Sequence, residues 1–365
     1  MWDTTGKRVC LVFAVIVVLF STSCFGEAGC RAGKSPLDEL PPYIRRATHF
    51  GQRADFSHDG KRILFIEKTY GDVYEAELET GVVRPMTHHY YHEGYVRALY
   101  LANGDILLSG ARKFDAEDPV PSRKKFAELW VLGKGLSGPP VALGEICYEG
   151  PAASRKRMHI VWTVGGTTED AAFYAGDIVY EDGVPKLANK KKILDKRELK
   201  GIMKYDIETQ NLRPPDEKEL IFSAYGDEYK ACEVAGLEIE TGKVVNYSMA
   251  PDRYGEPEGI FPDGKYTLVE CDRHNLKGTS YIDIYKLALD GSGRTERLTF
   301  FSDWPGYKSS NPVVSDDGRY MAFQYATKSD GAGVGRGILI FDLEMYENSV
   351  KDNKGCSGTS VDTKE

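Results

Sequence analysis

ADFSHDGKRILF, residues 54–65, sets an Asp-Gly pair between two short runs rich in apolar side chains. Asp-Gly supplies the positive φ angles that a tight hairpin turn requires, so the stretch predicts two antiparallel strands joined by a short turn. The same arrangement recurs at residues 99–110, 258–269 and 312–323, and with charged turns at 154–163 and 214–225. The turns fall near residues 60, 104, 155, 216, 264 and 318. This spacing predicts six structural repeats of about fifty residues each.

Each repeat continues in a similar way after its second strand. A polar loop leads to a third apolar run, a second tight turn such as Glu-Thr-Gly at 79–81 or 240–242 follows, and a fourth run ends in Met-Thr or Leu-Thr. Four antiparallel strands per repeat are typical of a β-propeller blade, so we predict an all-β, six-bladed propeller over residues 43–345. The last repeat lacks a fourth strand, and YIRRATHF at 43–50 matches VVRPMTHH at 82–89. We therefore expect the N-terminal strand to complete the last blade and close the ring.

ADFSHDGKRILF, EGIFPDGKYTLV and PVVSDDGRYMAF resemble the repeat of TolB-like propellers, the exported bacterial relatives of WD-type repeat proteins. The resemblance covers nearly all of residues 43–345. It implies a periplasmic or surface-attached propeller that serves as a binding module. TolB itself carries an additional α/β domain before its propeller, and we expect no room for one in this chain. A TolB-like role therefore does not follow from the shared repeat.

The N-terminus has the pattern of an export signal. Lys7 and Arg8 precede an apolar run from Val9 to Phe20, and small residues follow. This run is too short to span a bilayer and fits the apolar part of a secretory signal. We predict a signal peptide at residues 1–28, or alternatively a lipoprotein signal that ends before Cys24. The expected location is periplasmic or cell-surface, with or without a lipid anchor, and no transmembrane helix is expected.

Composition narrows the range of partners. The 365 residues carry a net charge of −8, so we expect no global attraction to nucleic acid or to an anionic membrane. Five of the seven cysteines follow the predicted signal without short paired spacings, which favours buried free thiols over a disulfide framework. We further expect a linker at residues 29–42, a disordered tail at 346–365, no cofactor and a monomer.

One face of the predicted propeller carries the longer connections. The loops between second and third strands and the crossings between blades lie on the same face, and here they are long and polar, as in GARKFDAEDPVPSRKKF at 110–126. Function concentrates on loops held by a rigid scaffold, so we expect the binding site on this face. The candidate ligand-binding residues are His88, His92, Glu93, Tyr95, Glu256, Glu258, Arg273, His274, Trp304 and Tyr307.

Several of these candidates have a specific chemical rationale. Arg273 and His274 suit a ligand that bears a carboxylate. Glu256 and Glu258 stand two positions apart on an expected crossing between blades and would point to one side as a pair of carboxylates. The two aromatic candidates suit stacking on a sugar ring or anchoring of a peptide. The structural alternatives are an exposed salt-bridged loop, a ring of charges around a solvated channel, and packing between blades.

The segment THHYYHEGY at 87–95 contains three of the seven histidines. A metal site would need three or more nitrogen or oxygen ligands at about 2.0–2.2 Å. In an extended strand His88 and His92 share a side while His89 points away, so three ligands from this segment would require a bend. Phe300 stands where His88 does in a later repeat, which predicts packing at that position. We expect no metal, and the weak candidate ligands are His89, His92 and His274.

Two functions from different classes remain open. The first is a non-catalytic binding module that docks a protein or a glycan on the loop-rich face, since no catalytic motif is recognisable. The second is a carbohydrate-active enzyme, an oligogalacturonate-type polysaccharide lyase that uses the same face. Its base and uronate-binding groups would be His92, Tyr95, Arg273 and His274, which must then converge on one pocket.

Overall fold

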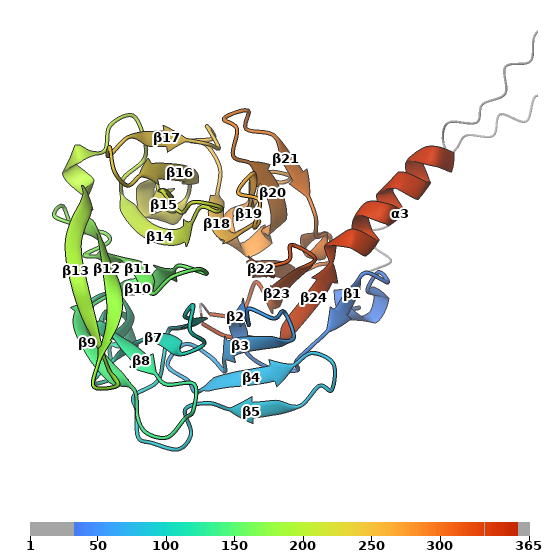
Figure 1. Ribbon diagram of the computed structural model, residues 1–365. Coiled ribbons are helices and arrows are strands. Elements are labelled where there is room, and N and C mark those ends of the chain that lie inside the picture. Colours follow the sequence, from blue (N-terminus) through green and yellow to red (C-terminus); the bar gives the residue numbers. More distant parts are fainter. Residues whose placement is uncertain (1–32, 332, 357–365) are drawn as a thin grey trace, which may run out of the picture.

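The computed structural model describes residues 33–331 and 333–356, and within them the chain is mostly β-structure. Its strands form six separate four-stranded antiparallel sheets, which follow one another around a common axis (Figure 1). The all-β, six-bladed propeller predicted from the repeats is therefore confirmed. Each of the six predicted hairpin turns connects the first and second strands of one blade.

The strands divide regularly among the blades. Blade 1 contains β2 (Gln52–Phe56), β3 (Arg62–Ile66), β4 (Val73–Glu77) and β5 (Val83–Pro85), and blade 2 contains β6 (Arg97–Tyr100), β7 (Ile106–Ala111), β8 (Ala127–Leu132) and β9 (Val141–Ile146). Blade 3 contains β10 (Tyr148–Ala153), β11 (His159–Val164), β12 (Ala172–Glu181) and β13 (Val184–Asp195), and blade 4 contains β14 (Asp206–Leu212), β15 (Glu219–Tyr225), β16 (Cys232–Glu238) and β17 (Val244–Asn246). Blade 5 contains β18 (Gly255–Ile260), β19 (Tyr266–Cys271), β20 (Asp283–Ala288) and β21 (Thr295–Arg297).

Blade 6 combines the first strand of the described chain with its last three strands. It contains β22 (Tyr307–Val314), β23 (Tyr320–Thr327), β24 (Ile338–Asp342) and β1 (Ile44–Arg46). Strand β1 pairs antiparallel with β24, with Ile44 opposite Phe341. The helices are α2 (Pro119–Lys124) and α3 (Leu343–Cys356), and the short 3-10 segments are η1 (Pro36–Glu39), η2 (Lys196–Glu198), η3 (Asp227–Tyr229), η4 (Gly278–Tyr281) and η5 (Phe301–Asp303).

The first strand of each blade lies innermost. Strands β2, β6, β10, β14, β18 and β22 contact one another in this order around the axis, and β22 contacts β2 again. They surround the central channel of the propeller. Because successive side chains of a strand point to opposite sides, each innermost strand directs some of its residues toward this channel.

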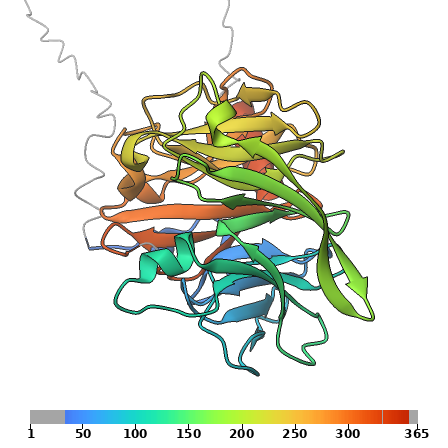
Figure 2. The ribbon, with the colours of Figure 1, turned by 90° about the vertical axis from the view of Figure 1, so that its left-hand side faces the viewer.

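The two faces of the ring carry different connections. The face with the connections between first and second and between third and fourth strands is here named the turn face, and the opposite face, with the remaining loops and the crossings between blades, is the loop face. Figure 1 looks onto the turn face. Figure 2 shows α2 on the loop face, while the long hairpin of β12 and β13 extends toward the turn face.

The glycine of the Asp-Gly turn in blade 5 is required for a steric reason. Gly264 has φ +68°, and a Cβ at this position would lie 1.9 Å from the carbonyl oxygen of Pro214 in the neighbouring blade. A side chain there would therefore clash with backbone, in addition to the strain of the left-handed conformation. The first turn of blade 5 thus packs directly against the first turn of blade 4.

Apolar packing joins adjacent blades. Phe173 of blade 3 and Phe222 of blade 4 make an edge-to-face contact with ring centroids 5.2 Å apart. Ile63 and Phe65 of blade 1 pack with Ile340 of blade 6 in one buried cluster. Each sheet therefore buries both of its faces against its neighbours, which explains why the second strands are nearly continuous apolar runs.

The end of the chain differs from the expected disordered tail at residues 346–365. Helix α3 extends through residues 346–356, and Tyr346 contacts the rings of Tyr43 and Phe341 at centroid distances of 5.3 and 5.2 Å. These aromatic contacts pack the first turn of the helix against blade 6. The predicted signal peptide and Cys24 lie outside the described residues. In the part of the chain that is described, no helix combines the length and the apolarity that crossing a bilayer requires.

The recurring Met-Thr and Leu-Thr pairs have a structural role. In blade 1 the backbone N–H of Val73 donates to Thr87 Oγ1 (3.0 Å), and this hydroxyl donates to Asp72 Oδ1 (2.7 Å). A hydroxyl at the corresponding place accepts the N–H of the third strand in three other blades, namely Thr299 in blade 5, Thr48 in blade 6 and Ser248 in blade 4. We name this contact the hydroxyl latch. It ties the end of the fourth strand to the start of the third.

Removing one latch should destabilise the propeller. Thr299 is buried, and its hydroxyl accepts from Ile284 N–H (2.8 Å) and lies 3.1 Å from Asp283 Oδ1. We predict that Thr299→Val lowers the free energy of unfolding by about 1–3 kcal/mol, because it leaves a buried N–H and a buried carboxylate short of a partner. Urea denaturation measures the change. The control Thr241→Val, in an exposed turn, should stay within about 0.5 kcal/mol of wild type.

Candidate functional site

Charged side chains are buried in the middle of the ring. The innermost strands supply Arg53, Arg97, Glu149, Glu208, Glu256 and Glu258, and β19 adds Glu270. The side chains of Glu149 and Glu258 are each 4% exposed, and those of Arg53 and Arg97 are 10% and 11% exposed. Buried charges are stable only when they are paired or hydrogen-bonded, so the channel must compensate them internally.

Tyrosine hydroxyls provide part of this compensation. Tyr225 donates to Glu256 Oε1 (2.5 Å), and Tyr254 donates to the other oxygen of the same carboxyl group. Burial, reinforced by the nearby Glu258, raises the pKa of Glu256 to about 7. Burial also raises the pKa of Glu208 and of Glu270. The channel therefore contains carboxyl groups that hold protons at a higher pH than exposed glutamates do.

This arrangement predicts a pH dependence of stability. The pKa of Glu256 is higher in the folded chain (about 7) than its usual value of 4.5, so the folded state binds the extra proton between these values. Stability attributable to this group is then fully present below about pH 4.5 and is lost as the pH rises through 7, with a slope of at most about 1.4 kcal/mol per pH unit. Glu256→Gln should therefore gain stability relative to wild type between pH 5 and pH 8.

Urea denaturation at a series of pH values tests this prediction. The control variant Glu240→Gln removes one charge at an exposed turn. A stability difference between Glu256→Gln and wild type that stays constant from pH 5 to pH 8 would contradict the assignment of the raised pKa to Glu256.

Helix α2 covers the loop-face end of the channel. It belongs to blade 2, but its carbonyl at Pro119 accepts a hydrogen bond from Tyr70 Oη of blade 1 (2.5 Å). Lys124 Nζ donates to Tyr229 Oη of blade 4 (2.7 Å), and Arg123 pairs with Glu149 of blade 3. The helix thus contacts three other blades, which is possible only close to the axis.

Arg155 spans the turn-face end of the channel. It lies in the first turn of blade 3, and its Nε donates to Asp316 Oδ1 of the opposite blade 6 (2.8 Å). Its Nη1 lies 3.3 Å from Asp55 Oδ2 of blade 1, and its Nη2 donates to the carbonyl oxygen of Phe56 (2.7 Å). Burial raises the pKa of Asp55 even though Arg155 acts in the opposite direction. One guanidinium therefore connects three blades across the axis.

A double-mutant cycle tests this connection. Arg155→Met should lower the free energy of unfolding by about 1–3 kcal/mol, since it leaves Asp55 as a buried charge without its partner. Adding Asp55→Asn should restore part of that loss, so the double variant should be more stable than Arg155→Met alone. The neighbouring exposed Lys156 provides the control variant Lys156→Met, for which a change within about 0.5 kcal/mol is expected. Strict additivity of the two changes would argue against the bridge.

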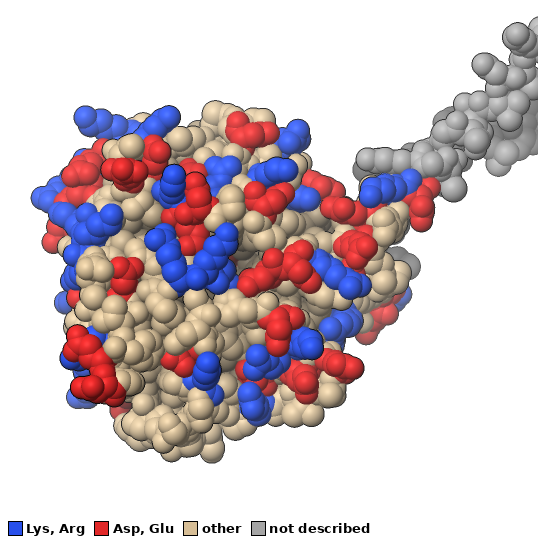
Figure 3. All heavy atoms as spheres, in the orientation of Figure 1, with Lys and Arg blue, Asp and Glu red and all other residues tan. Residues whose placement is uncertain are grey.

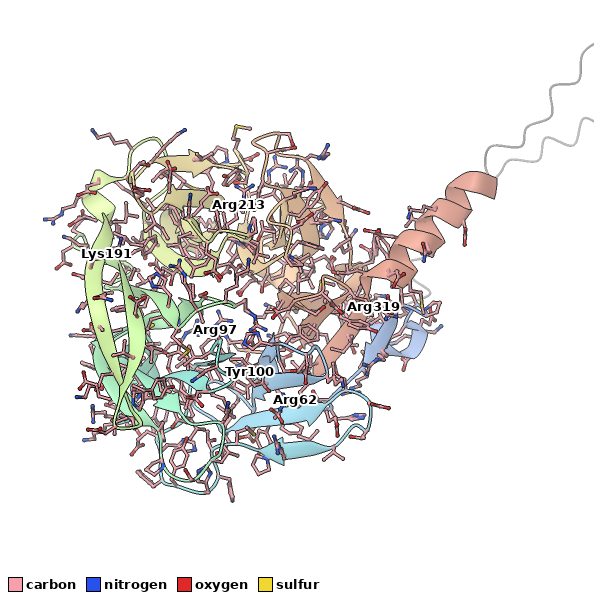
Figure 4. All side chains as sticks on the ribbon, viewed as in Figure 1. Arg62, Arg97, Tyr100, Lys191, Arg213 and Arg319 are labelled. Atoms are coloured by element: carbon pink, nitrogen blue, oxygen red, sulfur yellow. The ribbon has the colours of Figure 1, made fainter. Side chains whose placement is uncertain are left out.

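A cavity of about 230 Å³ lies at the turn-face end of the channel, beside Arg155. All six blades contribute to its wall, through residues close to the ends of their innermost strands. Figure 3 shows basic and acidic side chains intermixed around the middle of this face. In Figure 4 the labels of Arg97 and Tyr100, both residues of the wall, lie near the middle of the ring.

The loop face carries two further cavities. One of about 240 Å³ is lined by His92, Tyr95 and Trp130, and a wider one of about 700 Å³ lies beside Lys204 and Lys230. The binding site was expected on the loop face, but the structure has openings on both faces.

The histidine-rich segment at residues 87–95 is the crossing from blade 1 to blade 2. His92 Nε2 lies 2.9 Å from Asp72 Oδ1, the carboxylate of the blade 1 latch, and its Nδ1 accepts from Gly94 N–H (2.9 Å). His88 Nδ1 is 3.8 Å from Asp72 Oδ2. Burial alone would raise the pKa of Asp72, but hydrogen bonds from Thr87 and His92 outweigh it and lower that pKa. The segment therefore supports the hydroxyl latch of blade 1 through the contact of His92 with the carboxylate of Asp72.

Two details of the segment differ from the expectations. His88 was predicted to pack, by analogy with Phe300, yet its side chain is 79% exposed and Phe300 is also exposed. The crossings turn these positions outward. His89 lies apart from His92, with its Nε2 3.2 Å from the carbonyl oxygen of Gly138. Glu93 accepts a hydrogen bond from Tyr91, and Tyr95 is buried against Tyr90.

The remaining candidates occupy separate places. Glu256 and Glu258 both belong to the channel. His274 lies in the loop between β19 and β20, with its Nε2 2.6 Å from Ser302 Oγ and its Nδ1 3.0 Å from Tyr285 Oη. Arg273 beside it is exposed. Trp304 is buried and Tyr307 is half-buried, so both contribute to packing in blade 6.

The groups of the expected lyase site lie in different surroundings. His92 and Tyr95 line the cavity beside Trp130, whereas Arg273 lines another beside Cys232. Within residues 33–331 and 333–356, no group of three or more His, Cys, Asp or Glu is arranged to hold a metal ion. Sequence reasoning did not single out Arg97, Arg155 or Asn211. Their positions in first strands and turns carried no local signal beyond that of the repeat.

Comparisons with known proteins concern the fold. No family model matches the sequence, and no curated protein is similar to it. An oligogalacturonate lyase from Vibrio parahaemolyticus is similar in structure, with 12% identity, a TM-score of 0.48, and coverage of 80% of this chain and 78% of that chain. TolB from Acinetobacter baumannii has 15% identity and a TM-score of 0.45, with coverage of 80% of this chain and 66% of that chain. Hydrazine synthase from Kuenenia stuttgartiensis has 14% identity and a TM-score of 0.46, with coverage of 82% and 79%.

Proposed function

We propose that this protein is an exported binding module that docks a protein partner on its loop face. The observation that carries the proposal is the position of its exposed apolar side chains. Among the described residues, eight of the fourteen exposed large apolar side chains belong to loop-face connections. They are Tyr91, Val120, Phe126, Tyr205, Met249, Leu276, Phe300 and Val334.

These side chains come from connections all around the ring. The crossings between blades supply four of them, and the loops between second and third strands supply the other four. Contiguous exposed apolar surface is typical of interaction sites, and these eight side chains are the ones that the loop face would contribute to it. Phe, Tyr and Met are also enriched in protein interfaces. Val, Leu and Met cannot stack on a sugar ring as aromatic residues do, so the set favours a protein over a glycan.

The alternative expectation of a polysaccharide lyase has no comparable support. It needs an imidazole or phenol base beside a group that binds a uronate. His92 contacts the latch carboxylate Asp72 near blade 1, and His274 contacts Ser302 and Tyr285 in blade 5. The two imidazoles thus have different partners in different parts of the ring.

Two matched triple variants test the proposal. The first, Tyr91→Ser with Phe126→Ser and Leu276→Ser, changes the loop face. The second, Val82→Ser with Val184→Ser and Met345→Ser, changes exposed residues outside it. Chemical cross-linking in the source cells identifies the partner, and calorimetry with the purified partner measures its affinity. We expect the first variant to lower the affinity at least tenfold and the second to leave it unchanged. Equal loss in both variants, or loss in the second alone, would refute docking on the loop face.

A further inference from the structure

We propose a second binding site, for a small quaternary ammonium ion, in the cavity lined by His92, Tyr95 and Trp130. The site does not depend on the docking of a protein partner, because its ligand is a free small molecule. The inference rests on the aromatic rings of the wall, the pairing of their polar atoms, the charges of the wall and the size of the cavity.

The wall of this cavity is rich in aromatic rings. The crossing from blade 1 to blade 2, the end of β7, strand β8 and the connection before β9 form it. Five of its eleven residues are aromatic, namely Tyr90, Tyr91, His92, Tyr95 and Trp130. The imidazole of His92 contacts the rings of Tyr95 and Tyr90 at centroid distances of 4.8 and 5.5 Å. The face of an aromatic ring carries partial negative charge, so such a wall attracts cations.

Most polar atoms of these rings already have a partner within the protein. The hydroxyl oxygens of Tyr90 and Tyr95 lie 3.0 Å apart, and Tyr91 Oη donates to Glu93 Oε1 (2.5 Å). Both imidazole nitrogens of the wall and its indole N–H are hydrogen-bonded as well. A primary ammonium that leaves water must find acceptors for three N–H groups, whereas a quaternary ammonium has no N–H group. The wall therefore suits a cation that carries methyl groups in place of hydrogen-bond donors.

The charges of the wall also favour a cation. Arg112 belongs to the wall, and its Nε donates to Glu128 Oε1 (2.6 Å), so its charge is paired. Its guanidinium carbon lies 4.8 Å from the ring centroid of Trp130, which shows that one ring of this wall already carries a cation. Glu93 accepts the hydrogen bond of a neutral hydroxyl and has no ion-pair partner among the described residues. Its carboxylate can therefore compensate the charge of a ligand.

The size of the cavity limits the ligand to a small molecule. The volume of about 240 Å³ corresponds to roughly eight water molecules at about 30 Å³ each, which is enough for a cation of about seven non-hydrogen atoms such as choline. Pro139, Pro140 and Ala111 complete the wall with apolar surface, against which the methyl groups of the cation can pack. A largely apolar and aromatic wall with one charged group is typical of sites for small molecules.

Calorimetry on the full chain with three matched probes tests the proposal. The probes are choline, ethanolamine, in which three hydrogen atoms replace the methyl groups, and dimethylbutanol, in which a carbon atom replaces the nitrogen. We expect choline to bind at least about tenfold more tightly than either of the others, because only choline combines the charge with the methyl groups. Equal binding of choline and dimethylbutanol, tighter binding of ethanolamine, or no binding of choline at millimolar concentration would each overturn the proposal.

Three variants assign the binding to this cavity. Glu93→Gln keeps the shape of the side chain and removes its charge, so it should weaken choline binding at least about fivefold and leave Tm unchanged. The control Glu79→Gln removes one charge at an exposed turn of blade 1 and should leave choline binding as it is in wild type. Tyr91 is 85% exposed, so Tyr91→Leu should preserve the fold while it weakens binding of choline more than that of dimethylbutanol. Unchanged choline affinity in both Glu93→Gln and Tyr91→Leu would exclude this cavity as the site.

Discussion

Six sheets packed around one axis bring their innermost strands close together, and the remaining features of the molecule depend on this constraint. Each innermost strand directs side chains into the same narrow space. Ionisable groups from all around the ring therefore meet there, away from water. Arg97 faces Glu258, Arg123 pairs with Glu149, and Tyr225 and Tyr254 donate to Glu256. The network compensates charges that no single blade could stabilise by itself.

Different groups cover the two ends of the channel: the side chain of Arg155 on the turn face and helix α2 on the loop face. On the turn face the connections are short, and Arg155 reaches across the axis to acidic residues of two other blades. On the loop face the connections are long enough to form α2, which contacts blades 1, 3 and 4. The turn-face cavity lies beside Arg155, and eight of the fourteen exposed large apolar side chains of the described residues belong to loop-face connections.

The histidines show how a repeat can resemble a functional motif. His92 contacts Asp72, and His274 Nε2 lies 3.7 Å from Asp283 Oδ2. Both carboxylates belong to hydroxyl latches, in which Thr87 and Thr299 bind the backbone of the third strand. Burial, assisted by Arg297, lowers the pKa of His274. Imidazole beside carboxylate is a common arrangement in catalytic sites, but here the carboxylate is also part of the connection between two strands of a blade.

The sequence by itself determined the fold class, the number of blades and the places of the six hairpin turns, because alternation of apolar residues and Asp-Gly turns are local signals. It also indicated Glu256 and Glu258 as a pair of carboxylates, but on a crossing between blades; the structure places both in the innermost strand β18. Only the tertiary structure decided which residues from different blades meet. Arg155 meets Asp55 and Asp316, which lie 100 and 161 residues away in the chain, and Arg97 faces Glu258, which is 161 residues away. No local pattern encodes such contacts, since they depend on how all six sheets pack against one another.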